Sequence, residues 1–175
     1  VILRSEDKSS RKVLAEKYKL TPEELYNLVF NSESAVRATV GEIDEDEHWK
    51  QTGKKLGISG QELNDFQYQF WRGDLVDFEL IEFIRSLKGK YITALLSNAW
   101  SGARRALTID RACMDAFQYS IFSCEVGLAK PDEAIYHKIL KMVNVKPQQA
   151  IFVDDNLDNI VAANKMGIHG VQFFN

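Results

Sequence analysis

The stretch IFVDDNLDN, residues 151–159, is the most informative part of this chain. Three apolar residues lead directly into Asp154 and Asp155, and a segment with helical spacing then continues to Gly167. This pattern predicts a buried strand, an acidic turn and a helix. Two adjacent carboxylates repel each other, so we expect a divalent metal ion to neutralise them. Ligands of open α/β sheets bind beyond the carboxyl ends of the strands, which makes this turn a candidate functional site.

The residues after Gly89 alternate between predicted strands and helices. The strands are YITALLS (91–97), YSIFS (119–123), AIFVDD (150–155) and HGVQFF (169–174), and helical patterns lie around 101–112, 131–143 and 157–167. Such alternation is typical of a parallel sheet with helical crossovers. The sequence therefore predicts an α/β fold with a Rossmann-like parallel sheet and flanking helices.

Helical signatures dominate the first half of the chain. Capping boxes begin at Thr21, Asp44 and Ser59, each with a glutamate three residues later. Apolar residues follow them at helical spacing, so we expect residues 5–86 to form a small helical bundle without a strand. We interpret this bundle as a cap inserted into the α/β core. The predicted boundaries are 1–4 and 88–175 for the core and 5–87 for the cap.

The composition is that of a soluble globular protein, with 175 residues, 45% of them hydrophobic and 27% charged. The net charge is −3 and the basic residues are dispersed, which argues against nucleic acid or a membrane surface as a partner. Cys113 and Cys124 lack CxxC spacing, so we expect spectator thiols in a reducing compartment. With no apolar run near the roughly 20 residues of a membrane span and no signal-peptide pattern, we predict a cytoplasmic protein.

Polar residues follow three of the predicted strands. Ser97-Asn98 comes after the first strand and offers a hydroxyl and an amide to an anion. Lys130-Pro131 comes just before a helix that we expect to begin at Asp132. Proline suits the first position of a helix, and it holds the preceding residue, Lys130, in an extended conformation. Each signal alone has a plain structural interpretation, as a turn, a solvated lysine or an Asp helix cap.

Together the three signals predict phosphoryl transfer. Parallel strands end at one edge of a sheet, so Ser97, Lys130 and the Asp154-Asp155 pair are expected to meet there. A phosphoryl group carries spread negative charge, which a lysine and Mg²⁺ neutralise while a hydroxyl donor holds its oxygens. One or two carboxylates are enough for Mg²⁺, because this ion usually keeps several waters.

With these motifs in place, the chain resembles the haloacid dehalogenase superfamily of hydrolases, in its phosphatase-like branch with an inserted helical cap. The resemblance spans essentially the whole chain and rests on LLSN with Ser97 and Asn98, on Lys130 within VGLAKPDEAIY, and on FVDDNLDN with Asp154, Asp155 and Asn159. The segment GEIDEDEHW also resembles the cap of that branch.

The resemblance implies a role for each motif. Ser97 and Asn98 would bind the phosphoryl group, and Lys130 would steady the nucleophile and the phosphate. Asp155 would hold Mg²⁺, with Asp154 as a supporting or alternate ligand, and Asn159 would order the loop. The implied activity is Mg²⁺-dependent hydrolysis of small phosphate monoesters.

The first family motif, which carries an aspartate nucleophile, is missing from the sequence. The opening VILRSED resembles the continuation of that motif, so the nucleophile is expected just upstream of Val1, on the central strand of the sheet. Asp7 is a poor substitute for this nucleophile, because it lies where a helix is expected to begin and an aspartate there is typically a helix cap.

Three alternatives stay open. The chain could be a truncated, non-catalytic module that binds phosphate or another ligand, or a 2-haloacid dehalogenase that works without metal. A phosphorelay receiver domain uses similar residues, but its acidic pair comes first in the sequence, whereas here the pair comes last.

Trp100, just after Ser97-Asn98, is a candidate wall of a pocket for a small phosphorylated metabolite. The candidate substrate contacts in the cap are Trp49, Tyr68, Trp71 and Arg72, although aromatic residues at helical spacing are typical of a bundle core. No histidine is assigned a role, and His48 is expected on a solvated helix face. We expect a monomer or a homodimer.

Overall fold

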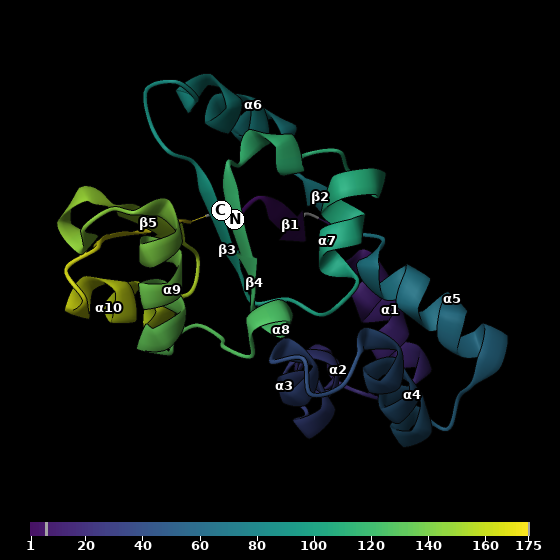
Figure 1. Ribbon diagram of the computed structural model, residues 1–175. Coiled ribbons are helices and arrows are strands. Elements are labelled where there is room, and N and C mark those ends of the chain that lie inside the picture. Colours follow the sequence, from purple (N-terminus) through teal and green to yellow (C-terminus); the bar gives the residue numbers. More distant parts are fainter. Residues whose placement is uncertain (6, 175) are drawn as a thin grey trace.

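The computed structural model describes residues 1–5 and 7–174 (Figure 1). The first half contains the helices α1 (Ser9–Lys17), α2 (Pro22–Phe30), α3 (Glu33–Thr39), α4 (Glu45–Leu56), α5 (Gly60–Trp71) and α6 (Phe78–Leu87) and the strands β1 (Leu3–Ser5) and β2 (Asp74–Val76). The second half contains the strands β3 (Ala94–Ser97), β4 (Tyr119–Phe122), β5 (Ile151–Asp154) and β6 (His169–Gln172). Its helices are α7 (Ala103–Arg105), α8 (Ser123–Val126), α9 (Glu133–Val143) and α10 (Leu157–Lys165), with the short helical segments η1 (Ala106–Asp110), η2 (Met114–Ala116) and η3 (Pro147–Gln149).

The predicted parallel strands are confirmed, and they form two pairs. β3 pairs with β4, with Leu96 opposite Ile121, and β5 pairs with β6, with Val153 opposite Val171. Within the described residues no strand hydrogen-bonds β3 to β5, and the two pairs stand apart (Figure 1). Helices flank both pairs, so the predicted α/β class is confirmed. A central strand from upstream residues stays a prediction.

The prediction that residues 5–86 contain no strand is wrong, because β2 lies in this range and pairs antiparallel with β1. Three residues are too few to show a period-2 pattern in the sequence, and the partner strand is distant along the chain. Gly73 precedes β2, and a Cβ atom there would overlap the carbonyl oxygen of Asp7, so this close approach needs glycine.

Two of the three predicted helix caps are confirmed. Thr21 forms a full capping box with Glu24, and the side chain of Asp44 accepts a hydrogen bond from the backbone of Glu47. Ser59 precedes α5 but makes no side-chain capping bond, which corrects that prediction. The physical reason is the left-handed conformation of Gly60, whose φ of +55° takes the first residue of the helix out of capping geometry.

The buried apolar residues form three clusters, and two of them contain residues from both halves of the chain. Helices α1 to α5 surround one cluster that includes Trp49, Phe66 and Phe70. Ile81 of α6 belongs to a different cluster, together with Phe122 of β4. Helices α9 and α10 form a third cluster with residues of β3, β4 and β5. The helices α1 to α5 gather at one end of the molecule (Figure 1), while the exact boundaries of the predicted cap stay a prediction.

His48 lies inside this bundle, so its predicted position on a solvated helix face is wrong. Its side chain is 0% exposed, its Nδ1 lies 2.9 Å from the hydroxyl of Ser34, and its ring centroid lies 4.4 Å from that of Trp100. The acidic residues before His48 occupy the first turn of α4, whereas His48 and Trp49 face the core. Burial lowers the pKa of His48 from 6.5 to about 4, so the ring is neutral at pH 7.

Cys113 and Cys124 are both free thiols, and burial raises the pKa of each. None of the helices in residues 1–5 and 7–174 is long and apolar enough to cross a membrane.

Candidate functional site

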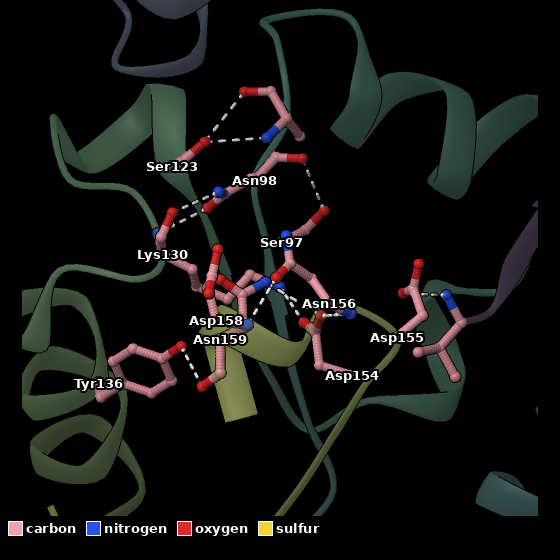
Figure 2. A network of polar contacts seen from close by, with 12 residues as sticks. Ser97, Asn98, Ser123, Lys130, Tyr136, Asp154, Asp155, Asn156, Asp158 and Asn159 are labelled. Atoms are coloured by element: carbon pink, nitrogen blue, oxygen red, sulfur yellow. Dashed lines mark hydrogen bonds and ion pairs between the residues drawn. The ribbon is translucent and has the colours of Figure 1, made fainter. Parts of the chain in front are cut away.

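Asp154 is the buried member of the acidic pair. It is the last residue of β5, and both oxygens of its carboxylate accept hydrogen bonds (Figure 2). Oδ2 accepts a hydrogen bond from the Lys130 ammonium at 2.6 Å, while Oδ1 accepts from the Asn156 backbone at 2.9 Å and from the Asn159 side chain at 3.0 Å. The predicted contribution of Asn159 to loop order has a direct physical basis in this last bond.

The pKa of Asp154 reflects opposing effects. Burial raises it, but the Lys130 charge and the hydrogen bonds from Lys130, Asn159 and Asn156 lower it more, so the pKa lies below its ordinary value. Asp154 is therefore ionised at neutral pH. Its interactions stabilise the fold above the unfolded-state pKa of an aspartate, and this stabilisation is lost as the pH falls through the lower pKa of the folded state.

Asp155 is the exposed member and points away from Asp154 (Figure 2). Its side chain is 69% exposed, and its Oδ1 lies 3.3 Å from the backbone nitrogen of Val1. Exposed carboxylate oxygens suit Mg²⁺, and one carboxylate can serve because the ion keeps several waters. The Asp155 carboxylate is thus more accessible than that of Asp154, and the role of either as a metal ligand stays a prediction. Within the described part of the chain, no three His, Cys, Asp or Glu side chains are grouped to hold a metal ion.

Asn98 positions Lys130. The Asn98 amide donates to the carbonyl of Lys130 at 2.8 Å and accepts from its backbone N–H at 2.8 Å, so two hydrogen bonds join the end of β3 to this residue (Figure 2). The Lys130–Pro131 peptide bond is cis, and α9 starts at Glu133 with Asp132 as its N-cap. Pro131 thus lies before the helix rather than at its first position, which corrects that prediction.

Ser97 lies at the carboxyl end of β3, where the sequence predicted it. Its hydroxyl makes one long contact, of 3.4 Å, with the carbonyl of Asn98. The following loop is fixed by the buried hydroxyl of Ser123, which accepts from the backbone N–H of Ala99 at 2.9 Å and donates to its carbonyl at 3.2 Å. Ser97 therefore keeps hydrogen-bonding capacity at the end of β3, next to a restrained loop.

Sequence reasoning missed Ser123 and Tyr136. The Tyr136 hydroxyl donates to the carbonyl of Asn159 at 2.9 Å, and its ring packs edge-on against Phe152 at 5.4 Å. Burial, followed by the charge of Asp154, raises the pKa of Tyr136, so the hydroxyl stays a donor. For Tyr136, the signal in the sequence was an aromatic residue at a core position of a helix, and such a position does not reveal a polar partner.

Trp100 packs against the helical bundle. It is 8% exposed, its ring stacks 5.9 Å from Phe30, and its indole N–H donates to Thr39 at 3.2 Å. Trp49 is buried in the same aromatic cluster, and Trp71 packs against it. The contribution of Trp100 to substrate binding stays a prediction, and its observed contacts are with the helical bundle.

A cavity of about 500 Å³ opens beside Asp155. Val1, Leu3 and Asp155 line it together with residues of α1 and α2. Arg72, a candidate for binding an anionic leaving group, lines a different cavity of about 350 Å³ between α1 and α5. Tyr68 is exposed and lines neither cavity.

The chain is similar in sequence to known hydrolases. The chain is 28% identical over 144 residues to a sesquiterpene phosphatase of Aspergillus oryzae, a match that covers 82% of this chain and 74% of the phosphatase. It is 27% identical over 131 residues to bifunctional epoxide hydrolase 2 of Mus musculus, which covers 70% of this chain and about a quarter (24%) of that protein.

The fold also matches a solved structure. A HAD family enzyme of Bacteroides thetaiotaomicron, in complex with magnesium and inorganic phosphate, aligns with a TM-score of 0.78 and 17% identity over 95% of this chain and 86% of the enzyme. This likeness shows that the two share a fold. A sequence profile of the family described as haloacid dehalogenase-like hydrolase matches residues 3–167. Since this match spans nearly the whole chain, the protein belongs to the haloacid dehalogenase-like hydrolases.

Proposed function

We propose that this protein is a Mg²⁺-dependent hydrolase of small phosphate monoesters. The observation that carries the proposal is the Lys130–Asp154 ion pair, which Asn98 ties to the strand end that bears Ser97. Lys130 supplies positive charge for the phosphoryl group, and the Ser97 hydroxyl donates to one of its oxygens. Asp155 would hold Mg²⁺, which would neutralise further charge on the transferring phosphate.

The nucleophile is proposed to be an aspartate just upstream of Val1. The backbone nitrogen of Val1 lies 3.3 Å from the Asp155 carboxylate, so a residue shortly before Val1 would be close to the proposed metal ligand. Its carboxylate would attack phosphorus while the bond to the leaving oxygen breaks, and water would then hydrolyse the resulting aspartyl-phosphate. The leaving alkoxide takes a proton from water or a nearby acid.

Measurements of turnover, phosphate binding and chloride release distinguish the proposed hydrolase from the non-catalytic module and from the dehalogenase. The protein is expressed from its full coding sequence, and release of p-nitrophenol from p-nitrophenyl phosphate is measured with Mg²⁺ and with excess EDTA. We expect turnover with Mg²⁺ and none after chelation. Activity that survives chelation contradicts the proposal, and phosphate binding without turnover supports the non-catalytic alternative. Chloride release from 2-chloropropionate without metal would instead identify a dehalogenase.

The metal ligand is tested by Asp155→Asn, which removes a charge and keeps the shape of the side chain. We expect a loss of roughly 100-fold or more in kcat/KM at saturating Mg²⁺, because the carboxylate that holds the ion is gone. The matched control is Asp158→Asn, three residues further on in the first turn of α10, which should retain activity. Equal activity of the two variants would exclude Asp155 as the ligand.

The small phosphorylated metabolite as substrate, the monomeric or homodimeric state and the cytoplasmic location are further parts of this proposal. The cavity beside Asp155 has room for a small leaving group, which supports the first of them.

A further inference from the structure

We propose that the cavity beside Asp155 selects phosphate monoesters whose leaving group carries a second negative charge, and that Lys8 and Lys12 bind this charge. The inference rests on the proposed function, because Asp155, the proposed metal ligand, lines this cavity.

Lys8 and Lys12 lie on the α1 side of the cavity. Lys8 is the N-cap residue of α1 and Lys12 follows one turn later, so their side chains share one face of the helix. Both line the cavity that Asp155 also lines. A substrate whose phosphate binds the Mg²⁺ at Asp155 and whose leaving group occupies this cavity would bring that leaving group near the two ammonium groups.

The other cations of this cavity are already paired. Arg11 donates to Asp74 at 2.7 Å, and Arg4 forms an ion pair with Asp77. In contrast, the residues that the structure describes provide no ion-pair partner for Lys8 or Lys12, and both side chains are exposed. The excess positive charge of the cavity is thus concentrated on one turn of α1, where it can attract an anion.

The residues of α2 that line the cavity are mainly apolar. Pro22, Leu25, Tyr26 and Phe30 line it, and they offer carbon surface rather than hydrogen-bond partners, apart from the Tyr26 hydroxyl. This wall suits a short carbon chain between the two charged ends of the substrate. The expected class is a phosphate monoester with a carboxylate or a second phosphate at the far end of its leaving group.

The test compares ω-carboxyalkyl phosphates with ω-hydroxyalkyl phosphates of equal chain length, and alkanediol bisphosphates form a second arm. We expect the wild-type protein to favour the charged member of each pair by about tenfold in kcat/KM, mainly through KM. The arm with the larger preference identifies the anion as a carboxylate or a phosphate. A preference for the hydroxyalkyl or plain alkyl phosphates would overturn the inference.

The double variant Lys8→Gln/Lys12→Gln should lose this preference and keep its kcat/KM for the hydroxyalkyl phosphates. The control is Lys17→Gln, which removes one positive charge from α1 at a residue that lines the other cavity, together with Arg72. The control should retain the preference. An equal loss for charged and neutral substrates, or a preference that survives the double variant, would contradict the assignment.

Binding separates this inference from the proposed function. The ω-carboxyalkyl and ω-hydroxyalkyl phosphonates cannot be hydrolysed, and their affinities are measured by calorimetry with and without Mg²⁺. A preference for the carboxylate that the double variant abolishes supports the lysine site even if no substrate is turned over. Turnover without any difference in affinity would retain the proposed function and reject the site.

Discussion

Lys130 is held through both its main chain and its side chain. The Asn98 amide fixes its backbone, and its ammonium is 2.6 Å from the Asp154 carboxylate in a pair whose side chains are 9% and 8% exposed. A lysine fixed in this way needs little rearrangement when it meets a phosphate, because its position is already set.

Replacing Lys130 by methionine should destabilise the protein by about 3 kcal/mol, since the Asp154 charge would remain buried without its partner. Urea unfolding measures this change in the free energy of unfolding. Adding Asp154→Asn should recover part of the loss, because the unpaired charge is then removed. The control, Lys138→Met on the exposed face of α9, should change stability by no more than about 0.5 kcal/mol. A Lys130 variant as stable as this control would contradict the buried pair.

His48 predicts a pH dependence of stability. The ring is neutral in the folded state, with a pKa of about 4, whereas the ordinary value is 6.5. The unfolded chain therefore binds a proton first as the pH falls, and this part of the stability, complete above about pH 6.5, is lost as the pH falls towards 4. We expect a loss of about 2 kcal/mol between pH 7 and pH 5. Urea unfolding at both pH values should show this loss in the His137→Gln control but not in His48→Gln.

The contact between α3 and α8 depends on a glycine. Gly41 follows α3 with a φ of +74°, and a Cβ atom there would overlap the carbonyl oxygen of Cys124. Gly57 ends α4 with a similar φ of +71° but has no neighbour within 4 Å. The two positions therefore share a conformational requirement and differ in available space.

We expect Gly57→Ala to cost about 1 kcal/mol and Gly41→Ala to cost roughly 1 to 3 kcal/mol more, because the second change adds a steric overlap to the same backbone strain. Thermal unfolding of the two variants measures the difference. Equal losses would show that α3 and α8 separate at little cost.

The outer residues of β5 support the predicted central strand. Ile151 and Val153 are 72% and 45% exposed although they are apolar strand residues. The crossover helices that connect a further parallel strand would cover such side chains, because these helices lie on the faces of a parallel sheet. The presence of this strand stays a prediction that the upstream coding sequence answers.

Trp100 joins the two halves of the molecule. It follows β3 in the α/β part, yet it packs against Trp49, Phe30 and His48 of the helical bundle. Glu45 adds to the same junction, because its carboxylate accepts from the Gly102 backbone at 3.1 Å. One loop of the core therefore carries both apolar and polar contacts to the bundle.

Trp100→Ala should destabilise the protein by about 3 kcal/mol or more, because a large buried ring is lost from the junction. Tyr68→Ala, at an aromatic residue that is 68% exposed, should change stability by no more than about 0.5 kcal/mol. Urea unfolding gives both values, and limited proteolysis should show faster cleavage between bundle and core in the Trp100 variant alone. A stable, protease-resistant Trp100 variant would contradict this account of the junction.

The sequence alone determined the α/β class, the helical first half and the convergence of Lys130 and Asp154. These features depend on periodicity over many residues and on the rule that parallel strands end at one edge of a sheet, so local patterns report them well. The same patterns placed Asp154 and Asp155 at the end of β5.

The different environments of residues that are neighbours in the sequence were set by the tertiary structure alone. Asp154 is buried against Lys130 while Asp155 is exposed, His48 enters a core that includes Trp100, and Asn98 binds the main chain of Lys130. Each of these outcomes depends on partners that are far away along the chain, and β1 and β2 pair for the same reason. A single sequence does not specify such contacts, because they arise from the packing of whole elements rather than from local propensity.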